Sequence, residues 1–366
     1  SSDVCSYDLK IFLDVMYDDT KNARKIKSCD YNHEGKYPII DQSSKNVIGY
    51  TDEIDGLYND VPVIIFGDHT RRFKLVEEPF FIGADGTKVL KLRSSVYDYK
   101  FIYYYLLHKK IPDTGYNRHF KWVKELEFPE IPRSIQSDIV KKLEVLNDLI
   151  SSKNKLLESF DILIKSRFVE LIYNNKLIYQ KVRLKDCCLI SSGATPSRKN
   201  SDYWDENGIN WFKTTELKNN FLFDSDEKIS KLGYEKTSVK ILPKHTVLIA
   251  MYGQGKTRGM TGYLLNNATT NQACAALISL DTINPKYLWY TMINSYDRLR
   301  NMAKGGTQPN LSVSLIKDFE IILPPIDIQN KFTNYIEQIN KLKSDVQKSI
   351  EETQLLMDSL MQEYFG

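Results

Sequence analysis

Two stretches of the sequence, PRSIQSDIVKKLEVLNDLISSKNKLLESFDILIKSRFVE at residues 132–170 and PIDIQNKFTNYIEQINKLKSDVQKSIEETQLLMDSLMQE at residues 325–363, align with each other without a gap. Twelve aligned positions are identical, and they include Gln136 with Gln329 and Glu144 with Glu337. An internal repeat predicts that the same structural unit occurs twice. The chain is therefore expected to have two halves built on one plan.

Each copy of the repeat is predicted to be one long helix. Its apolar residues follow the alternating spacing of four and three that forms a coiled-coil seam, interrupted by Lys153: Ile139, Leu143, Leu146, Ile150, Leu157, Phe160 and Ile164 in the first copy, and Phe332, Ile336, Ile339, Val346, Ile350 and Met357 in the second. A helix of about 38 residues is about 57 Å long, far more than a single-domain core needs. Two such helices can bury their seams against each other, and an antiparallel pair would put the two preceding segments at opposite ends.

The segments before the two helices are predicted to be globular and loosely related. Each has a buried strand, Val63–Phe66 or Val247–Ala250, and later the start of a short helix, at 100–104 or 286–290. A chain of 366 residues is long enough for two independent cores. The predicted fold class is α+β: two globular α/β domains at 1–132 and 179–325, separated by two long antiparallel coiled-coil helices at 133–178 and 326–366, with pseudo-twofold symmetry.

Composition excludes several classes of protein. No apolar run approaches the roughly 20 residues of a membrane span, and the first residues lack the basic and apolar regions of a signal peptide, so we expect a cytoplasmic protein. The five cysteines show no metal-ligand spacing and are predicted to be buried free thiols. The net charge of +3 is uneven, because residues 179–325 carry 19 Lys and Arg against 13 Asp and Glu.

Residues 250–257, AMYGQGKT, fit a permissive phosphate-loop pattern. Such a loop needs a helix directly after it, because the helix N-terminus surrounds the phosphates. Here the glycines and alternation at 258–265 predict a hairpin or a second strand. The same loop offers Tyr252, Gln254, Lys256 and Arg258 to base edges and phosphates, so a DNA-contacting loop is favoured over a nucleotide site, with a solvated turn as the alternative.

Other segments also combine basic, amide and aromatic side chains. Residues 304–310 pair glycines with amides, and 68–74 and 116–121 interleave basic residues with aromatics; a polar connection or a surface strand pair remains the alternative for each. The Asn207-Gly208 pair between Trp204 and Trp211 signals a hairpin, which favours packing over base stacking for the two indoles. The predicted DNA-binding residues are Asp68, His69, Thr70, Arg71, Arg72, Lys74, Tyr116, Asn117, Arg118, His119, Lys121, Lys213, Thr214, Tyr252, Gln254, Lys256, Arg258, Lys304, Thr307, Gln308 and Asn310.

Catalytic motifs are incomplete throughout the sequence. The five histidines show no HExxH spacing, which zinc hydrolases need. Asn284-Pro285-Lys286-Tyr287 lacks the second proline of a methyltransferase Asn-Pro-Pro-Tyr motif, and no Gly-rich cofactor loop accompanies it. We therefore predict no catalytic residue, no bound metal and no bound cofactor in this chain.

With this organisation in view, the chain resembles the specificity subunits of type I restriction-modification systems over nearly its whole length. The second half carries the likeness in order and spacing: SGATPS at 192–197, YW at 203–204, INW at 209–211, VLI at 247–249, YG at 252–253, NQA at 271–273, GGTQPNL at 305–311 and LPP at 323–325, followed by Gln329. The first half is similar to a different recognition-domain subtype, in GKYP at 35–38, GY at 49–50, VIIFGD at 63–68 and GADG at 83–86.

The resemblance implies a non-catalytic subunit with two target-recognition domains that read unlike halves of a bipartite site in double-stranded DNA. It also implies docking of two adenine methyltransferase subunits and of restriction subunits, with S-adenosylmethionine and ATP bound by those partners. Two alternatives from other classes remain open, a nucleotide-hydrolysing enzyme using residues 250–257 and a coiled-coil scaffold without nucleic-acid binding. A helix after Thr257 would favour the first, and failure to bind duplex DNA would favour the second.

Overall fold

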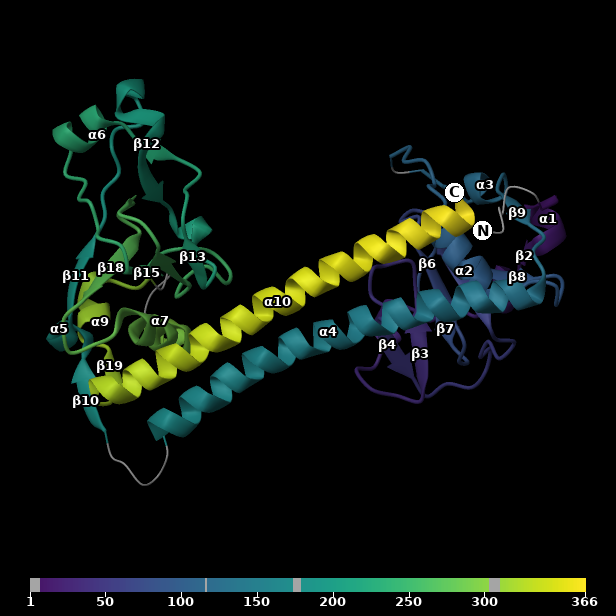
Figure 1. The fold of residues 1–366 in the computed structure, drawn as a ribbon, viewed down its shortest axis with the longest axis horizontal. Coiled ribbons are helices and arrows are strands. Elements are labelled where there is room, and N and C mark those ends of the chain that lie inside the picture. The colour runs from purple at the N-terminus through teal and green to yellow at the C-terminus, as the bar shows by residue number, and fades with distance from the viewer. Residues whose placement is uncertain (1–6, 116, 174–178, 303–309) are drawn as a thin grey trace. The chain divides into compact units, whose positions relative to one another are not determined.

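The computed structural model describes residues 7–115, 117–173, 179–302 and 310–366 (Figure 1). The chain divides into two compact units, each with a globular segment and part of both long helices. Unit 1 comprises residues 1–157 and 345–366, and unit 2 comprises residues 158–344. Within the described residues, none of the helices combines the length and apolar character that a membrane span requires.

Both copies of the repeat form long helices, as predicted: α4 (Arg133–Tyr173) and α10 (Ile326–Phe365), of 41 and 40 residues. Within unit 1 the helices run antiparallel, because Lys142 lies against Tyr364 (3.2 Å) while Lys153, further along α4, donates to Ser349 Oγ at 2.8 Å. Within unit 2 the same direction holds, because Lys343 bonds Asp161 at 2.7 Å while Phe168, further along α4, packs on Phe332 with ring centroids 5.3 Å apart.

The seam between the helices is closed in the way the spacing predicted. Its outer apolar residues, such as Leu143 and Phe332, are fully buried, and its middle residues are partly buried. Lys153 interrupts the apolar pattern, and its ammonium is satisfied by the hydroxyls of Ser349 and Thr353, both at 2.8 Å. A half-buried cation is tolerated there because it has hydrogen-bond acceptors.

Unit 1 is built on small sheets packed against short helices. A four-stranded sheet has the order β2-β8-β5-β6, a three-stranded sheet has the order β4-β3-β7, and β1 pairs with β9. The strands are β1 (Leu9–Ile11), β2 (Met16–Asp18), β3 (Tyr37–Ile40), β4 (Gly49–Thr51), β5 (Val63–Gly67), β6 (Phe73–Val76), β7 (Phe81–Ile82), β8 (Thr87–Leu92) and β9 (Glu127–Pro129); the helices are α1 (Phe12–Val15), α2 (Tyr99–His108) and α3 (Phe120–Val123), with 3₁₀ turns at Thr20–Asn22 and Ser28–Asp30.

Unit 2 has a five-stranded sheet of order β11-β18-β15-β16-β13, a three-stranded sheet of order β14-β12-β17, and the pair β10-β19. The strands are β10 (Gln180–Arg183), β11 (Cys188–Ser192), β12 (Trp204–Phe212), β13 (Asn220–Leu222), β14 (Lys228–Ile229), β15 (Val247–Ala250), β16 (Thr261–Leu264), β17 (Thr269–Thr270), β18 (Cys274–Ser279) and β19 (Glu320–Leu323); the helices are α5 (Leu184–Cys187), α6 (Lys231–Lys236), α7 (Pro285–Asn294), α8 (Tyr296–Met302) and α9 (Val313–Lys317), with 3₁₀ turns at Ser201–Tyr203 and Thr214–Glu216.

The predicted buried strands are β5 and β15, whose side chains are all buried, and the predicted short helices are α2 and α7. The hairpin expected at Asn207-Gly208 is wrong. Residues 204–212 form one strand, β12, which bulges between Trp204 and Ile209 as it pairs with β14. Gly208 is required there for close packing, because a Cβ atom would lie 2.3 Å from the Ile229 carbonyl oxygen.

The described cysteines are free, but one departs from the prediction. Cys187, Cys188 and Cys274 are buried, whereas Cys29 is exposed. No group of three or more His, Cys, Asp or Glu side chains in the described ranges could hold a metal ion.

Candidate nucleic-acid interface

The loop between β15 and β16 carries the first group of predicted DNA-binding side chains. Tyr252 is 41% exposed, Gln254 and Lys256 are exposed, and Arg258 is half-buried. Strands β15 and β16 pair antiparallel, so the chain leaves the loop into a strand. The hairpin prediction is therefore confirmed, and the helix that a phosphate loop requires is replaced by β16.

Helix α8 holds this loop through its backbone. The Tyr296 hydroxyl donates to the Lys256 carbonyl at 2.7 Å, and the Arg300 guanidinium donates to the Arg258 carbonyl at 2.9 Å. Gly255 has φ +59°, a conformation that suits glycine. With its carbonyls held from beneath, the loop keeps the side chains of Gln254 and Lys256 in solvent.

Three further segments meet this loop at the same edge of the sheet. The Leu311 amide donates to the Met251 carbonyl at 3.0 Å, which places exposed Asn310 beside the loop. The Met251 amide donates to the Ala273 carbonyl (2.8 Å), and the Asn271 amide to the Phe212 carbonyl (3.1 Å), directly before Lys213 and Thr214. Predicted contacts that are distant in sequence are therefore neighbours. Lys304, Thr307 and Gln308 lie outside the described residues.

Lys213 is already engaged by protein carboxylates. Its ammonium lies 2.6 Å from Glu227 Oε1, and this hydrogen bond raises the pKa of Lys213 above its ordinary value. Its backbone N–H donates to Glu216 at 2.7 Å, and Thr214 is half-buried. Lys213 therefore organises this corner, and a phosphate would have to compete with Glu227 for its charge.

Sequence reasoning did not select Gln272 as a contact, although its position is suitable. Gln272 is exposed between Asn271 and Ala273, and the Thr195 hydroxyl donates to its side-chain oxygen. That bond orients the amide and leaves its NH₂ group toward solvent. The signal in the sequence was the NQA motif itself, which pointed to the family but not to a role.

The two tryptophans pack together as predicted. A contact that was not predicted is made by an arginine, which lies over the rings and pairs with a glutamate. Trp204 and Trp211 meet edge to face, with centroids 5.1 Å apart. The Arg198 guanidinium lies 4.1 Å from the Trp204 centroid and is paired with Glu227. These rings are occupied in packing within this cluster, and the cluster supports the sheet edge that carries Lys213.

In unit 1 the structure joins the two predicted basic segments. The Asp68 carboxylate accepts from the Phe120 amide at 2.7 Å, and the Asp68 carbonyl accepts from the His119 amide at 2.9 Å. Asp68 is 3% exposed and His119 is 1% exposed. The selection of these two as DNA contacts is corrected on this ground, because both are occupied in hydrogen bonds that join Thr114 and the start of α3 to the β5–β6 turn.

The neighbouring side chains differ in how open they are. Arg72 and Lys121 are exposed, as are Asn117, Arg118 and Thr70, whereas His69 is half-buried. Arg71 has φ +58° and bonds Asp113 at 2.7 Å. Lys74 is 11% exposed at its side chain and donates to the Asp41 carbonyl at 2.6 Å, so it holds the loop before β4. Tyr116 lies outside the described residues.

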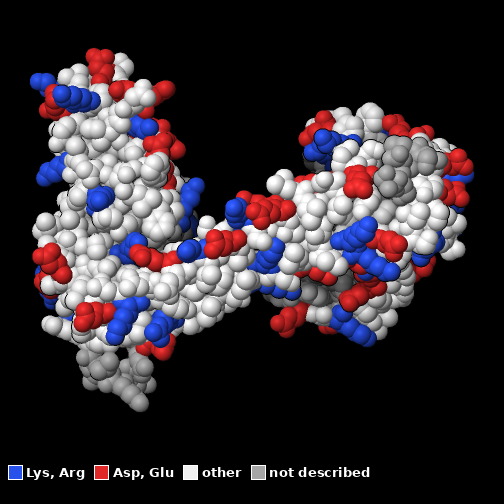
Figure 2. Space-filling model, viewed as in Figure 1, with Lys and Arg blue, Asp and Glu red and all other residues white. Residues whose placement is uncertain are grey.

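Charges of both signs are mixed on the face of the molecule drawn in Figure 2, and this face shows no broad patch of basic residues. This agrees with the small net charge of +3. Long-range attraction to a polyanion is then modest, and recognition depends on individual side chains in the loops.

Comparison with known proteins shows which family this chain is similar to. Residues 178–353, which include the edge described in unit 2, match the family model of the type I restriction modification DNA specificity domain. The second half of the chain is therefore similar to this family. The specificity subunit of the type I restriction enzyme EcoR124I/EcoR124II from Escherichia coli is 24% identical over 351 residues, which are 89% of this chain and 84% of that protein.

Solved structures share the fold of these specificity proteins over nearly the whole chain. The crystal structure of the S subunit of a type I restriction-modification system from M. genitalium has a TM-score of 0.61 at 16% identity, and the match covers 99% of this chain and 96% of that one. A chain from a study of complex assembly and conformational transition of the type I R-M system has a TM-score of 0.62 at 16% identity, with the same coverage. The predicted fold class is thereby confirmed.

Proposed function

We propose that this chain is the sequence-reading subunit of a type I restriction-modification complex, that it binds double-stranded DNA at a bipartite site, and that it performs no chemistry itself. One observation carries the proposal: in unit 2, three segments far apart in sequence meet at one sheet edge and present Tyr252, Gln254, Lys256, Gln272 and Asn310. Amides paired with cations are the groups that read base edges and hold phosphates.

Unit 1 would read the other half of the site with different chemistry. Its exposed candidates are Thr70, Arg72, Asn117, Arg118 and Lys121, carried by the β5–β6 turn and the segment before α3. Because the two units present unlike side chains, the half-sites are expected to differ. Two methyltransferase subunits and restriction subunits would supply catalysis, and S-adenosylmethionine and ATP would bind those partners. Such a complex works on chromosomal DNA, so we place it in the cytoplasm.

The direct test is to express the chain with its methyltransferase partner and sequence the methylated adenines in the host DNA. Two unlike motifs separated by a constant number of unread base pairs are expected. A continuous motif, or no motif that depends on this chain, would contradict the proposal. In parallel, the affinity of the complex for duplex DNA should fall steeply with salt, whereas a scaffold would show no such binding.

The nucleotide-hydrolysing alternative makes an opposite prediction. The purified chain should show no ATP turnover, and Lys256→Ala should leave that background unchanged. ATP hydrolysis abolished by Lys256→Ala would restore the phosphate-loop interpretation.

A further inference from the structure

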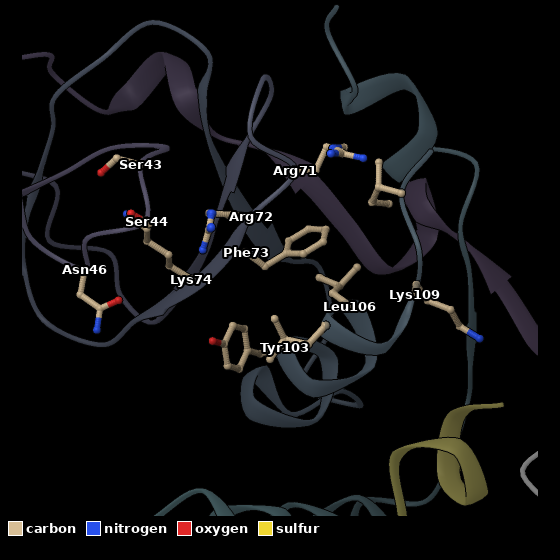
Figure 3. Close-up of a pocket in the computed structure, with 12 residues that line it drawn as sticks. Ser43, Ser44, Asn46, Arg71, Arg72, Phe73, Lys74, Tyr103, Leu106 and Lys109 are labelled. Carbon is tan, nitrogen blue, oxygen red and sulfur yellow. The ribbon is translucent and has the colours of Figure 1, made fainter. Parts of the chain in front are cut away.

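A cleft of 440 Å³ opens in unit 1, apart from the buried contacts that organise the β5–β6 turn (Figure 3). It lies between β6, the loop before β4 and the end of α2, and its lining includes Asn46, Arg71, Arg72, Phe73, Lys74 and Tyr103. Clefts of this size hold small molecules or a single nucleotide-sized group.

The charge of the lining is one-sided, because four of its residues are basic and none is acidic. Arg71 is paired with Asp113, and Lys74 donates to the carbonyls of Asp41 and Lys45 at 2.6 and 2.5 Å. Arg72 differs from both: it is exposed, and its guanidinium makes no ion pair or hydrogen bond with any described residue. Figure 3 shows it beside Lys74, directed between Ser44 and Phe73.

Hydrogen bonds to backbone carbonyl groups, and not to a carboxylate, hold the Lys74 ammonium at the cleft. Its only carboxylate neighbour among the described ion pairs is Asp41, at 3.9 Å, which is too far for a hydrogen bond. Burial, with a smaller contribution from Arg72, lowers the pKa of Lys74, and the carbonyls fix the position of its amino group in the loop. A guanidinium that is free to bind and an ammonium fixed beside it favour a phosphoryl group, which accepts bidentate bonds from arginine.

The opposite wall supplies a surface for a flat group. The ring of Tyr103 faces the cleft across from Phe73 and Leu106 (Figure 3). Burial raises the pKa of Tyr103, so its hydroxyl stays protonated and does not repel an anion. Asn46 adds an exposed amide, and the Ser43 hydroxyl is buried without a hydrogen-bond partner among the described residues. Aromatic faces stack nucleobases, and amides bond their edges.

We propose that this cleft binds one nucleotide, with its phosphate on Arg72 and its base against Tyr103. The shared chemistry is a nucleoside phosphate, which could be a free nucleotide or a nucleotide extruded from bound DNA. The inference goes beyond the reading of a duplex proposed above, and binding of a free nucleotide does not depend on that proposal.

The test titrates adenosine 5′-monophosphate, adenosine and inorganic phosphate into the full chain by isothermal calorimetry. The monophosphate should bind, and adenosine should bind at least about tenfold more weakly, because it lacks the charged group. Arg72→Gln and Tyr103→Leu should each weaken the monophosphate about tenfold. Lys110→Gln is the matched control: this exposed lysine lies outside the cleft lining and should leave the affinity unchanged.

A competition experiment then separates the two sources. If the nucleotide comes from DNA, the monophosphate should displace part of a bound duplex, and Arg72→Gln should abolish the displacement. If the cleft takes a free nucleotide, the monophosphate should weaken duplex binding no more than Arg72→Gln itself does, because only the Arg72 contact is shared. The proposal is overturned if the monophosphate does not bind at millimolar concentration, or if Arg72→Gln behaves as Lys110→Gln does. Neither result would alter the methylation motif that tests the proposed function.

Discussion

Gln136 and Gln329 occupy the same position in the two copies of the repeat, and each makes the same three hydrogen bonds. Gln136 accepts from the Asp98 amide at 2.8 Å and donates to the carbonyls of Val96 and Ile131; Gln329 accepts from the Asn284 amide at 2.8 Å and donates to those of Thr282 and Pro324. Both glutamines are fully buried. Asp98 and Asn284 are in turn the N-caps of α2 and α7. Each long helix is thus tied at its start to the cap of a globular helix.

Gln136→Ala and Gln329→Ala should each cost about 1 to 3 kcal/mol of local stability, because buried backbone groups lose their partners. The loss should be confined to one unit in each variant. Hydrogen exchange measured by mass spectrometry should quicken in α2 for the first variant and in α7 for the second. Gln347→Ala, at an exposed position of α10, serves as the control. Equal quickening of α2 and α7 in either variant would count against this assignment.

In the unit 2 loop, we expect some side chains to determine which bases are preferred and others to determine the overall affinity for DNA. Gln254→Ala should cost about 1 to 3 kcal/mol on the preferred duplex and relax choice at one base pair, and Asn310→Ala should act similarly. Lys256→Ala should weaken all duplexes and lower the salt slope by about one. Fluorescence anisotropy at several salt concentrations measures both effects, with Lys240→Ala as an exposed control outside the loop. Unchanged motif and affinity in all three loop variants would leave the solvated-turn interpretation.

Tyr296→Phe should loosen that loop without unfolding unit 2. It removes two hydrogen bonds, the one that the hydroxyl donates to the Lys256 carbonyl and the one that it accepts from Arg300 at 3.1 Å, and keeps the ring that packs near Gly259. Hydrogen exchange at 252–258 should rise, and affinity for the second half-site should fall a few-fold, while the melting temperature stays within about a degree or two. Tyr234→Phe is the matched control. A large fall in melting temperature would show that Tyr296 supports the core and not the loop.

Helix length should set the number of unread base pairs. Deleting about one heptad from both α4 and α10 keeps the seam in register and should change the spacing between the methylated motifs. The bases within each half-site should stay the same, because the loops are untouched. Sequencing of methylated adenines measures both quantities. Altered half-site bases at constant spacing would refute the prediction.

Acid should weaken the corner that holds Lys213. The Arg198 guanidinium, with help from Lys213, holds the pKa of Glu227 below its ordinary 4.5. Because the folded pKa is depressed, the stabilisation is present above pH 4.5 and is lost as the pH falls through the folded pKa. Glu227→Gln should therefore be less stable than the parent chain at pH 7, with the difference closing as the pH falls below 4.5 and through the folded pKa. Urea unfolding at pH 7 and at a series of pH values below 4.5 checks this, and a constant difference would contradict it.

Periodicity predicted the parts of this fold that depend on local pattern. The two long helices, the buried strands β5 and β15 and the hairpin after Ala250 follow from the spacing of apolar residues and glycines. Periodicity could not predict the roles of polar residues whose hydrogen-bond partners are far along the chain. Asp68 was expected on the surface because its basic neighbours are there, but its carboxylate bonds an amide 52 residues away. Gly208 was expected in a turn, although its task is to let β12 pass the Ile229 carbonyl.

The same limit applied to the candidate interface. From the sequence, Lys213 was expected to be available for DNA, but in the structure its ammonium bonds Glu227. Gln272 was not selected from the sequence, although the Thr195 hydroxyl orients its side-chain amide. A single sequence names the side chains that can contact DNA. It does not show which of them the protein has already used.

The composition of unit 1 bears on how the chain is made. Its core includes Phe365, whose ring lies 5.5 Å from that of Phe101 and 5.6 Å from that of Tyr105. Unit 2, by contrast, is one continuous stretch, residues 158–344. During synthesis on the ribosome, all residues of unit 2 are therefore made before unit 1 is complete. Until the last turns of α10 have been made, the apolar face of α2 in unit 1 stays exposed. Removing the last turn of α10 would leave that face uncovered.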